Sequence, residues 1–287
     1  MSFTPPPPKP VSPGLYLVAT PIGNLRDITL RALDVLAAAD VVLAEDTRVT
    51  GKLLSAYGLS KKLVRYDEHV AAQAGPRILE DLAAGKVVAQ VSDAGTPLIS
   101  DPGQVLAREA AAAGYPVHPI PGPSSVLAAL SVAGLPTERF LFTGFLPPKS
   151  GARRARLEEL ATSRATLVLF ETGPRLRASL EDMAEVLGAD RPAAVARELT
   201  KLHEELRAGT LAELADYYSE TSPRGELTIV MEGTGTPPAP PDRTSDAMEE
   251  AAALLAQGLT RREVARRLTE TLGLPRNDAY RLVMGLP

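Results

Sequence analysis

Short runs of aliphatic and β-branched residues alternate with longer segments that repeat apolar positions at helical spacing over the first 120 residues. The short runs have the length and composition of buried strands, and the longer segments those of amphipathic helices. Five strands are predicted, at 15–20, 40–44, 62–66, 87–92 and 115–120. The helices predicted between them cover 29–39, 49–58, 74–85 and 103–114. This alternation predicts a mostly parallel sheet with helices on both faces.

A second set of alternating segments follows the Pro-Gly-Pro-Ser-Ser sequence at 121–125. Its predicted strands are 140–145, 166–172, 193–200 and 226–232. Its predicted helices are 124–134, 155–161, 175–188 and 211–219. The predicted fold class is therefore α/β, with two α/β halves that join near residue 121.

Proline marks the two ends of this core. The chain has 26 prolines in 287 residues, about 9% against a usual share of about 5%, and clusters of them lie at 5–13 and 237–241. Such segments are extended and poor in side chains that can pack. We predict a disordered tail at 1–13, an N-terminal α/β domain at 14–121, a C-terminal α/β domain at 122–233, a linker at 234–241 and a small helical module at 242–287. The three short helices of the module are typical of a helix-turn-helix bundle.

Composition removes several kinds of chemistry. The absence of cysteine excludes disulfides, a thiolate nucleophile, iron–sulfur clusters and cysteine-based zinc sites. The three histidines are far apart in the sequence, which disfavours a histidine-rich metal centre. The net charge of −4 provides no global attraction to nucleic acid, so any such contact has to be local. Without a signal peptide or a long apolar run, we expect a soluble, cytoplasmic protein.

Glycine- and proline-rich loops follow four of the predicted strands, at 20–29, 92–103, 121–125 and 170–174. Ligands bind outside the carboxyl ends of the strands in open α/β sheets, where glycine allows close backbone approach and proline fixes the loop shape. One such loop by itself is more often a simple turn, but four together favour a ligand site. The chain has no P-loop motif, and its first loop lacks G-x-G-x-x-G, which disfavours a P-loop NTPase and an ordinary Rossmann dehydrogenase.

Seven ordered motifs carry a resemblance to a known family. They are VATPIGNLRDITLRAL, AEDTR, VSDAGTPLISDPG, PIPGPSSVLAAL, GFLPPK, RELTKLHEE and GELTIVMEG. Together they resemble the RNA-modifying branch of the tetrapyrrole-methylase superfamily over residues 14–233, and the last helices resemble a small helical domain often appended to that branch. One motif departs from the pattern, because FETGPRL has Gly173 and Pro174 where the branch usually has Pro-His.

The resemblance implies S-adenosyl-L-methionine bound in a cleft between the two α/β halves, with no metal. It also implies methylation of the ribose 2′-hydroxyl of a cytidine in the decoding region of 16S rRNA, within the small ribosomal subunit, by a homodimer. The superfamily's cofactor motifs fall on these residues of the chain: Pro21, Ala94, Gly95, Thr96, Ile99, Ser124, Ser125, Phe170, Glu171 and Leu199. Asp93 lies beside this set and is a further candidate, as a hydrogen-bond acceptor for the cofactor.

Charged motifs near these loops offer candidates for catalysis. Glu45 in AEDTR and Glu204 in RELTKLHEE are candidates to accept the hydroxyl proton. Arg48 and Lys201 are candidates to stabilise the developing alkoxide or to hold phosphate. Taken singly, a charged residue of this kind is more often solvated or ion-paired at the surface.

Two basic clusters are candidates for RNA contact. Seven basic and three acidic residues lie between Lys149 and Arg177, and four arginines lie at 261, 262, 266 and 267. The alternative is that these arginines only solubilise helix faces. Two other functions stay open at this point: a methyltransferase acting on a tetrapyrrole carbon, and a non-catalytic RNA-binding or ribosome-assembly protein.

Overall fold

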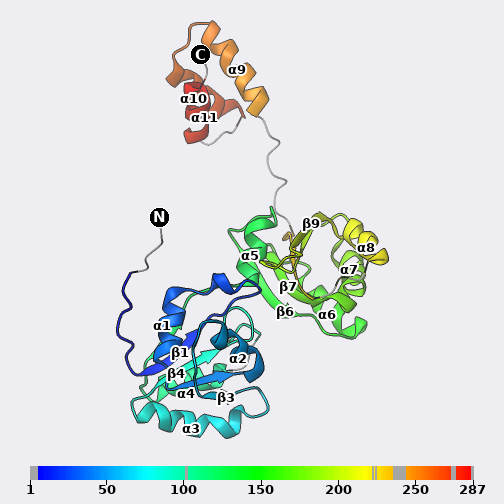
Figure 1. Cartoon of the computed structure of the whole chain (residues 1–287). Helices are drawn as coiled ribbons and strands as arrows, with labels where there is room; N and C mark the ends of the chain where they lie inside the picture. The colour runs from blue at the N-terminus through cyan, green and yellow to red at the C-terminus, as the bar shows by residue number, and fades with distance from the viewer. Residues whose placement is uncertain are drawn as a thin grey trace. The chain divides into compact units, whose positions relative to one another are not determined.

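The structure is a computed structural model, and it describes residues 6–100, 103–221, 223, 225–234, 244–272 and 276–285 (Figure 1). Residues 1–5 of the predicted tail, 101–102 of the predicted loop at 92–103 and 235–241 of the predicted linker lie outside these ranges. The chain divides into two compact units, residues 1–234 and 235–287. The first unit contains both predicted α/β halves.

The first half is built on a five-stranded sheet in the order β3-β2-β4-β1-β5, in which every pair is parallel. The strands are β1 (Gly14–Val18), β2 (Val41–Ala44), β3 (Leu63–Arg65), β4 (Val87–Val91) and β5 (Val117–Ile120). The helices are α1 (Leu30–Ala38), α2 (Thr47–Ala56), α3 (Ala71–Ala83) and α4 (Gln104–Ala112), with a 3-10 turn η1 (Leu25–Asp27) after β1. The predicted parallel sheet is confirmed.

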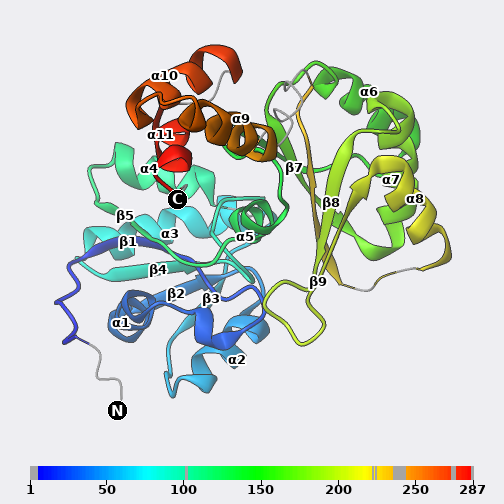
Figure 2. The ribbon, with the colours of Figure 1, turned by 90° about the horizontal axis from the view of Figure 1, so that it is seen from above.

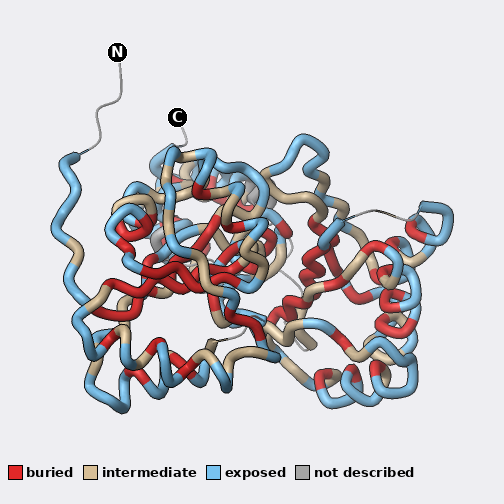
Figure 3. Tube along the Cα trace, turned by 60° about the horizontal axis from the view of Figure 1, so that its bottom comes forward, coloured by how far each residue is buried: buried red, intermediate tan, exposed pale blue. Residues whose placement is uncertain are grey.

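Helices cover both faces of this sheet, which explains why its strands are apolar at successive positions. In β2, Val42 and Ala44 pack with α1 and α2, whereas Val41 and Leu43 pack with α3 and α4. Figure 2 shows the two helix pairs on opposite sides of the sheet. All residues of β2 and β4 are buried, and the strands form the interior of the half in Figure 3. The functional groups therefore have to come from the loops at the strand ends.

The second half has a mixed sheet in the order β6-β7-β10-β8-β9, in which β6 and β7 are parallel and the other pairs antiparallel. Its strands are β6 (Phe140–Phe145), β7 (Thr166–Thr172), β8 (Pro192–Arg197), β9 (Glu205–Thr210) and β10 (Glu226–Met231). Its helices are α5 (Ser125–Val132), α6 (Ser150–Leu160), α7 (Gly173–Leu187) and α8 (Leu211–Glu220). One face packs on α6, α7 and α8, and the other packs on α5.

Two details of this half differ from the predicted elements. The strand predicted at 193–200 ends at Arg197, because Glu198 and Thr200 have φ angles of 49° and 66°, which no strand contains. Strand β9 was not predicted, since its sequence ELRAGT lies at the sheet edge with no fully buried position. An edge strand that buries little has a weak apolar pattern.

The second unit contains α9 (Thr244–Ala256), α10 (Arg261–Leu272) and α11 (Arg276–Met284). They enclose a small core that includes Ala251, Val264, Leu268 and Val283. Thr260 caps α10, where its hydroxyl accepts from the Glu263 amide and the Glu263 carboxylate accepts from the Thr260 amide at 2.9 Å. The predicted helical module after the α/β halves is thus confirmed.

In the described residues, no helix has the length and apolar character needed to cross a bilayer.

A buried ion pair joins α6 to α7 in the second half. The Asp182 carboxylate accepts hydrogen bonds from Arg153 Nε and Arg154 Nε, both at 2.7 Å, and from the Ser150 hydroxyl at 2.9 Å. The side chains of Arg153 and Asp182 are each only 5% exposed. Burial raises the pKa of Asp182, but the hydrogen bonds from Arg154, Ser150 and Arg153 outweigh it and hold the pKa below its ordinary value.

We expect Asp182→Asn to lower the free energy of unfolding by about 3–5 kcal/mol, because the buried Arg153 charge loses its partner. Urea unfolding at pH 7 measures this loss. The matched control is Glu181→Gln on the same helix, whose partner Arg177 is exposed, and it should cost about 1 kcal/mol or less. The folded pKa of Asp182 lies below its unfolded value, so the difference from wild type should shrink below about pH 4. Equal losses for the two variants would show that the buried ion pair contributes no more to the free energy of unfolding than the exposed one.

Candidate functional site

The loops after β1, β4 and β5 are bonded to one another at the carboxyl edge of the first sheet. Thr20 and Gly95 exchange two backbone hydrogen bonds of 2.9 and 3.0 Å. The Thr20 hydroxyl donates to the Ser92 carbonyl at 3.0 Å, and the Thr96 hydroxyl donates to the Pro123 carbonyl at 3.2 Å. Gly95 has a φ of 84°, a conformation that a side chain would strain. The three glycine- and proline-rich loops thus form one continuous floor.

The loop between β8 and β9, residues 198–204, reaches this floor from the second half. The Asn24 amide donates to the Thr200 hydroxyl at 3.0 Å. A Cβ atom at Gly23 would lie 2.9 Å from that hydroxyl oxygen and 3.0 Å from the Leu199 carbonyl oxygen. Glycine at position 23 thus allows the two halves to approach closely, and any side chain there would force Thr200 and Lys201 to shift.

Backbone strain is concentrated in the loops that border the site. The described non-glycine residues with positive φ are Leu98, Ser100, Glu198 and Thr200. Two of them lie in the β4–α4 loop and two in the 198–204 loop. Such conformations cost of order 1–3 kcal/mol each and persist where the surrounding structure imposes them. In the 198–204 loop, the Glu204 carboxylate accepts from the Thr200 amide at 2.5 Å and holds the turn.

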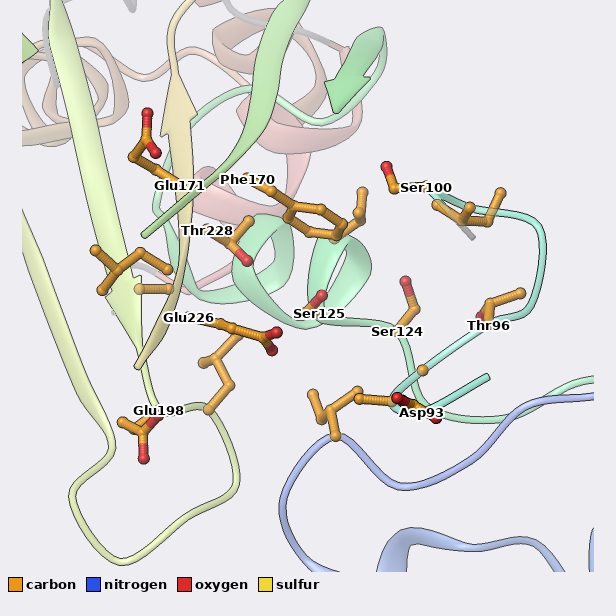
Figure 4. Close-up of a pocket in the computed structure, with 18 of the residues that line it drawn as sticks. Asp93, Thr96, Ser100, Ser124, Ser125, Phe170, Glu171, Glu198, Glu226 and Thr228 are labelled. Atoms are coloured by element: carbon orange, nitrogen blue, oxygen red, sulfur yellow. The ribbon is translucent and has the colours of Figure 1, made fainter. Parts of the chain in front are cut away.

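A cavity of about 280 Å³ lies between these loops and the second sheet. Ten of the eleven residues predicted to contact a cofactor line it: Asp93, Ala94, Gly95, Thr96, Ile99, Ser124, Ser125, Phe170, Glu171 and Leu199. Figure 4 shows Ser124 and Ser125 at the start of α5, between Asp93 of the first half and Phe170 of the second. Pro21 does not line the cavity, and the next residue, Ile22, does.

Several residues that line the cavity were not predicted, and two of them are carboxylates. Glu198 and Glu226 each begin a Glu-Leu-Thr sequence at one end of a strand. Strands β8 and β10 are antiparallel, with Leu227 opposite Arg197, so the end of one lies beside the start of the other. The repeated Glu-Leu-Thr was the available signal, but only the antiparallel register brings the two carboxylates to one site (Figure 4).

Glu171 has a different environment from the other carboxylates. It is 1% exposed, and its oxygens accept from the Ser179 hydroxyl at 2.6 Å and from the Thr172 amide at 2.8 Å. Arg175 forms an ion pair with it at 3.2 Å. Its carboxylate therefore joins β7 to α7 within the second half, next to Gly173 and Pro174, where the sequence differs from the family motif. Glu171 lines the cavity, but its carboxylate oxygens already have partners within the second half.

The lining combines three kinds of surface. Phe170 packs against Phe145 and Phe142, with ring centroids 5.5 and 4.8 Å apart, and forms an apolar wall. Ser124 caps α5, where its hydroxyl accepts from the Leu127 amide, so amide groups and serine hydroxyls meet at this helix start. The carboxylates of Asp93 and Glu226 supply negative charge, whereas that of Glu198 is paired with Lys201. A ligand with a planar apolar group, an anionic group and a cationic centre matches this set.

Over the described ranges, no three His, Asp or Glu residues are grouped to hold a metal ion.

A second cavity of about 740 Å³ adjoins the first and shares Glu45, Asp93 and Ser100 with it. Its other lining residues are Asp46, Thr47, Arg48, Arg65, Asp67, Glu68 and His69. Burial and the nearby charges of Asp93, Asp67, Glu68 and Asp46 raise the pKa of Glu45. Burial also raises the pKa of Asp93, although its carboxylate accepts from the Asp46 amide at 3.1 Å. Glu45 thus lies at the junction of two cavities.

The four catalytic candidates do not all line the same cavity. Glu45 lines both cavities, Lys201 lines the first, and Arg48 lines the second. Glu204 lines neither. Arg48 is held by the Asp46 carboxylate, with an Nε–Oδ1 distance of 3.0 Å, and this contact lowers the pKa of Asp46 well below its ordinary range. Lys201 donates from Nζ to Glu198 at 2.9 Å.

Most basic residues of the first cluster, between Lys149 and Arg177, form ion pairs with carboxylates of the second half. Arg153 and Arg154 pair with Asp182, and the remaining pairs are Arg156–Glu159, Arg175–Glu171 and Arg177–Glu181. Within this described segment, only Lys149 and Arg164 lack an ion pair. On α10, Arg261 donates to the Val283 carbonyl at 3.1 Å, whereas Arg262 and Arg267 are exposed. Fewer basic side chains are therefore free to contact phosphates than the count of lysines and arginines in these clusters suggests.

Comparison with known proteins supports one family. A profile of the family described as Tetrapyrrole (Corrin/Porphyrin) Methylases matches residues 14–215. The chain is 54% identical over 241 residues to Ribosomal RNA small subunit methyltransferase I of Mesorhizobium japonicum, covering 83% of this chain and 82% of the relative. It is 43% identical over 272 residues to the protein of the same name from Synechocystis, covering 95% of this chain and 98% of the relative.

Solved structures share the fold at lower identity. Uroporphyrin-III-C-methyltransferase from Thermus thermophilus superimposes with a TM-score of 0.55 at 28% identity, covering 75% of this chain and 93% of the other. A cobalt precorrin-4 methyltransferase gives a TM-score of 0.56 at 19% identity over 76% of this chain and 94% of the other, which shows the fold alone.

We expect Gly23→Ala to loosen the two loops that meet there, because the added methyl group would overlap the Lys201 side chain and the Thr200 hydroxyl and force them to shift. Amide hydrogen exchange should become faster in residues 20–29 and 198–204. Gly151→Ala is the matched control, since a Cβ at that helical position meets open space. Unchanged exchange in both loops of Gly23→Ala would show that the contact does not restrain them.

Proposed function

Because the chain belongs to the tetrapyrrole methylase family, we propose that it transfers a methyl group from S-adenosyl-L-methionine to the ribose 2′-hydroxyl of a cytidine in the decoding region of 16S rRNA. The observation that carries the proposal is the similarity to relatives named for ribosomal RNA methylation, at 43% identity over 95% of the chain. The uroporphyrin-III-C-methyltransferase and the cobalt precorrin-4 methyltransferase are only 28% and 19% identical to this chain.

The first cavity has the groups that this methyl donor requires. Phe170 and Leu199 offer an apolar surface for a planar base, and Ser124 and Ser125 at the start of α5 offer donors for a carboxylate. The Asp93 and Glu226 carboxylates suit a positively charged ligand. The donor, when bound, supplies a methyl group on a sulfonium, which an oxygen nucleophile can displace. Nothing in this chemistry calls for a metal.

Glu45 is the residue that we propose to accept the proton of the ribose hydroxyl. It lines both cavities, so its carboxylate can face a donor in the first and an acceptor ribose in the second. Burial, together with the neighbouring carboxylates, raises its pKa and so makes it a stronger base. Lys201 at the edge of the first cavity is paired with Glu198, and Arg48 at the second cavity is paired with Asp46. To stabilise the developing alkoxide or to hold a phosphate, each cation has to share its charge with the substrate or exchange its carboxylate partner. Glu204 acts on the loop backbone instead, through its bond to the Thr200 amide.

The ribosomal substrate implies a cytoplasmic enzyme, and membership of the superfamily supports a homodimer. Light scattering on the purified protein tests the dimer directly. The second cavity, of about 740 Å³, is the proposed place of the acceptor nucleotide, and the small subunit is the proposed partner.

Transfer of labelled methyl to small subunits that lack the modification, followed by mapping of the label, tests the proposed function. The expected product is a 2′-O-methylcytidine in the decoding region. Label on a base would contradict the proposed acceptor, and label on a porphyrinoid instead of RNA would favour the tetrapyrrole alternative. Binding of the subunit with no transfer would favour a non-catalytic role in assembly.

We expect Glu45→Gln to lower kcat by about 10²–10⁴-fold, the contribution typical of a positioned base, with little change in the Kd of the methyl donor. The wild-type rate should fall on acidification as Glu45 becomes protonated, at a higher pH than an ordinary glutamate would give, because its pKa is raised. The variant should lack this dependence. Glu68→Gln is the control in the second cavity: it should keep the pH dependence but shift it to lower pH, because the Glu68 charge helps to raise the pKa of Glu45. An equal loss in both variants would remove the assignment of Glu45 as the base.

A further inference from the structure

The tip of the 198–204 loop carries an unusually exposed leucine. Leu202 is 91% exposed, more than any other large apolar side chain among the described residues. Lys201 and His203 on either side are exposed as well. A single exposed leucine is common on protein surfaces, so its significance depends on how this loop is supported and on what lies beside it.

The loop cannot bury Leu202 by folding back, because its backbone is held at several points. The Lys201 amide donates to the Glu198 carbonyl at 2.9 Å, and the Glu204 amide donates to the Lys201 carbonyl at 3.2 Å. The Glu204 carboxylate and the strained φ angles of Glu198 and Thr200 fix the same turn. Leu202 is therefore presented on a rigid support.

The first half presents a similar pair of side chains next to this loop. Leu25 is 48% exposed and begins the 3-10 turn η1, and Arg26 beside it is exposed. The Asn24 side chain accepts from the Arg26 amide at 3.1 Å, and the Asn24 amide donates to the Thr200 hydroxyl. The Tyr57 hydroxyl donates to the Leu25 carbonyl and anchors the turn to α2. The two loops thus meet at one hydrogen bond, with an apolar and a cationic residue on each side.

We define the loop seam as Leu25, Arg26, Lys201, Leu202 and His203, and we propose that it docks the RNA strand that contains the target nucleotide. Arg26 contacts a phosphate, and Leu202 packs against the face of an unstacked base, which holds the target ribose open to the cavities. The inference rests on the proposed function and extends it to the surface that binds the substrate.

The location and chemistry of the seam favour RNA over another protein. Lys201 belongs to both the seam and the wall of the first cavity, so a strand on the seam continues into the reaction site. A ribose inside a helical stack is poorly accessible, and enzymes that act on one nucleotide displace it, often with an apolar side chain inserted between bases. Two leucines are also too few for a stable protein interface, which needs about 800 Å² on each partner.

The experiment compares Leu202→Ser and Arg26→Gln with wild type on small subunits that lack the modification. Leu141→Ser is the matched control, because Leu141 is 41% exposed on the edge strand β6. We expect Leu202→Ser to lower kcat/KM for the subunit by at least about tenfold, with an unchanged Tm and an unchanged Kd for S-adenosyl-L-methionine measured by calorimetry. We expect Arg26→Gln to raise KM for the subunit and to weaken its dependence on salt concentration, because one phosphate contact is lost.

The outcomes separate the two proposals. If wild-type protein binds the methyl donor but transfers nothing to RNA, the proposed function fails, and the seam loses its role with it. If wild type methylates the subunit and Leu202→Ser matches wild type or Leu141→Ser, the docking inference alone is overturned. Conversion of a dimer to a monomer by Leu202→Ser would also overturn it, since the leucine would then contact a second copy. A loss of donor affinity in Leu202→Ser would place the leucine in cofactor binding instead.

Discussion

The close approach at Gly23 is the contact on which the site depends. Each α/β half packs its own sheet against its own helices, so neither core dictates how far apart the two halves lie around the cavity. The 198–204 loop reaches the first half at Gly23 and Asn24, where the bond from the Asn24 amide to the Thr200 hydroxyl and the missing Cβ allow contact. That approach brings Leu199 and Lys201 to a cavity whose floor belongs to the first half.

Environment gives chemically identical carboxylates different roles. Asp182 is surrounded by arginines and a serine, so its charge is stabilised and it serves the packing of α6 on α7. Glu171 is similarly occupied by Ser179 and Arg175. Glu45 and Asp93 are instead partly buried beside other carboxylates, and burial together with these charges raises their pKa values and makes them stronger bases. Carboxylates whose environments shift their pKa values in opposite directions are typical of sites where one of them moves a proton.

Free positive charge is scarcer than the sequence suggests. The cluster from Lys149 to Arg177 contains seven basic residues, but the fold pairs five of them with carboxylates of the same half. Ion pairing of this kind stabilises the helices and withdraws the arginines from phosphate binding. Cations that remain exposed next to the cavity, such as Arg26, therefore gain importance for a polyanionic substrate.

Local sequence was sufficient for most of the elements and for the loops that line the first cavity, because apolar periodicity and glycine–proline turns are encoded within a few residues of each position. Val41 to Ala44 and the loop from Asp93 to Thr96 were predicted on that basis, and the carboxyl ends of parallel strands bring such loops to one edge. Strand β9 and the strand end at Arg197 were not predictable in this way, since one is an edge strand and the other is stopped by positive φ angles. Only the antiparallel register placed Glu198 beside Glu226, and only the packing of the halves placed Glu45 between two cavities. Those relations join residues far apart in the chain, so no local pattern of hydrophobicity or charge specifies them.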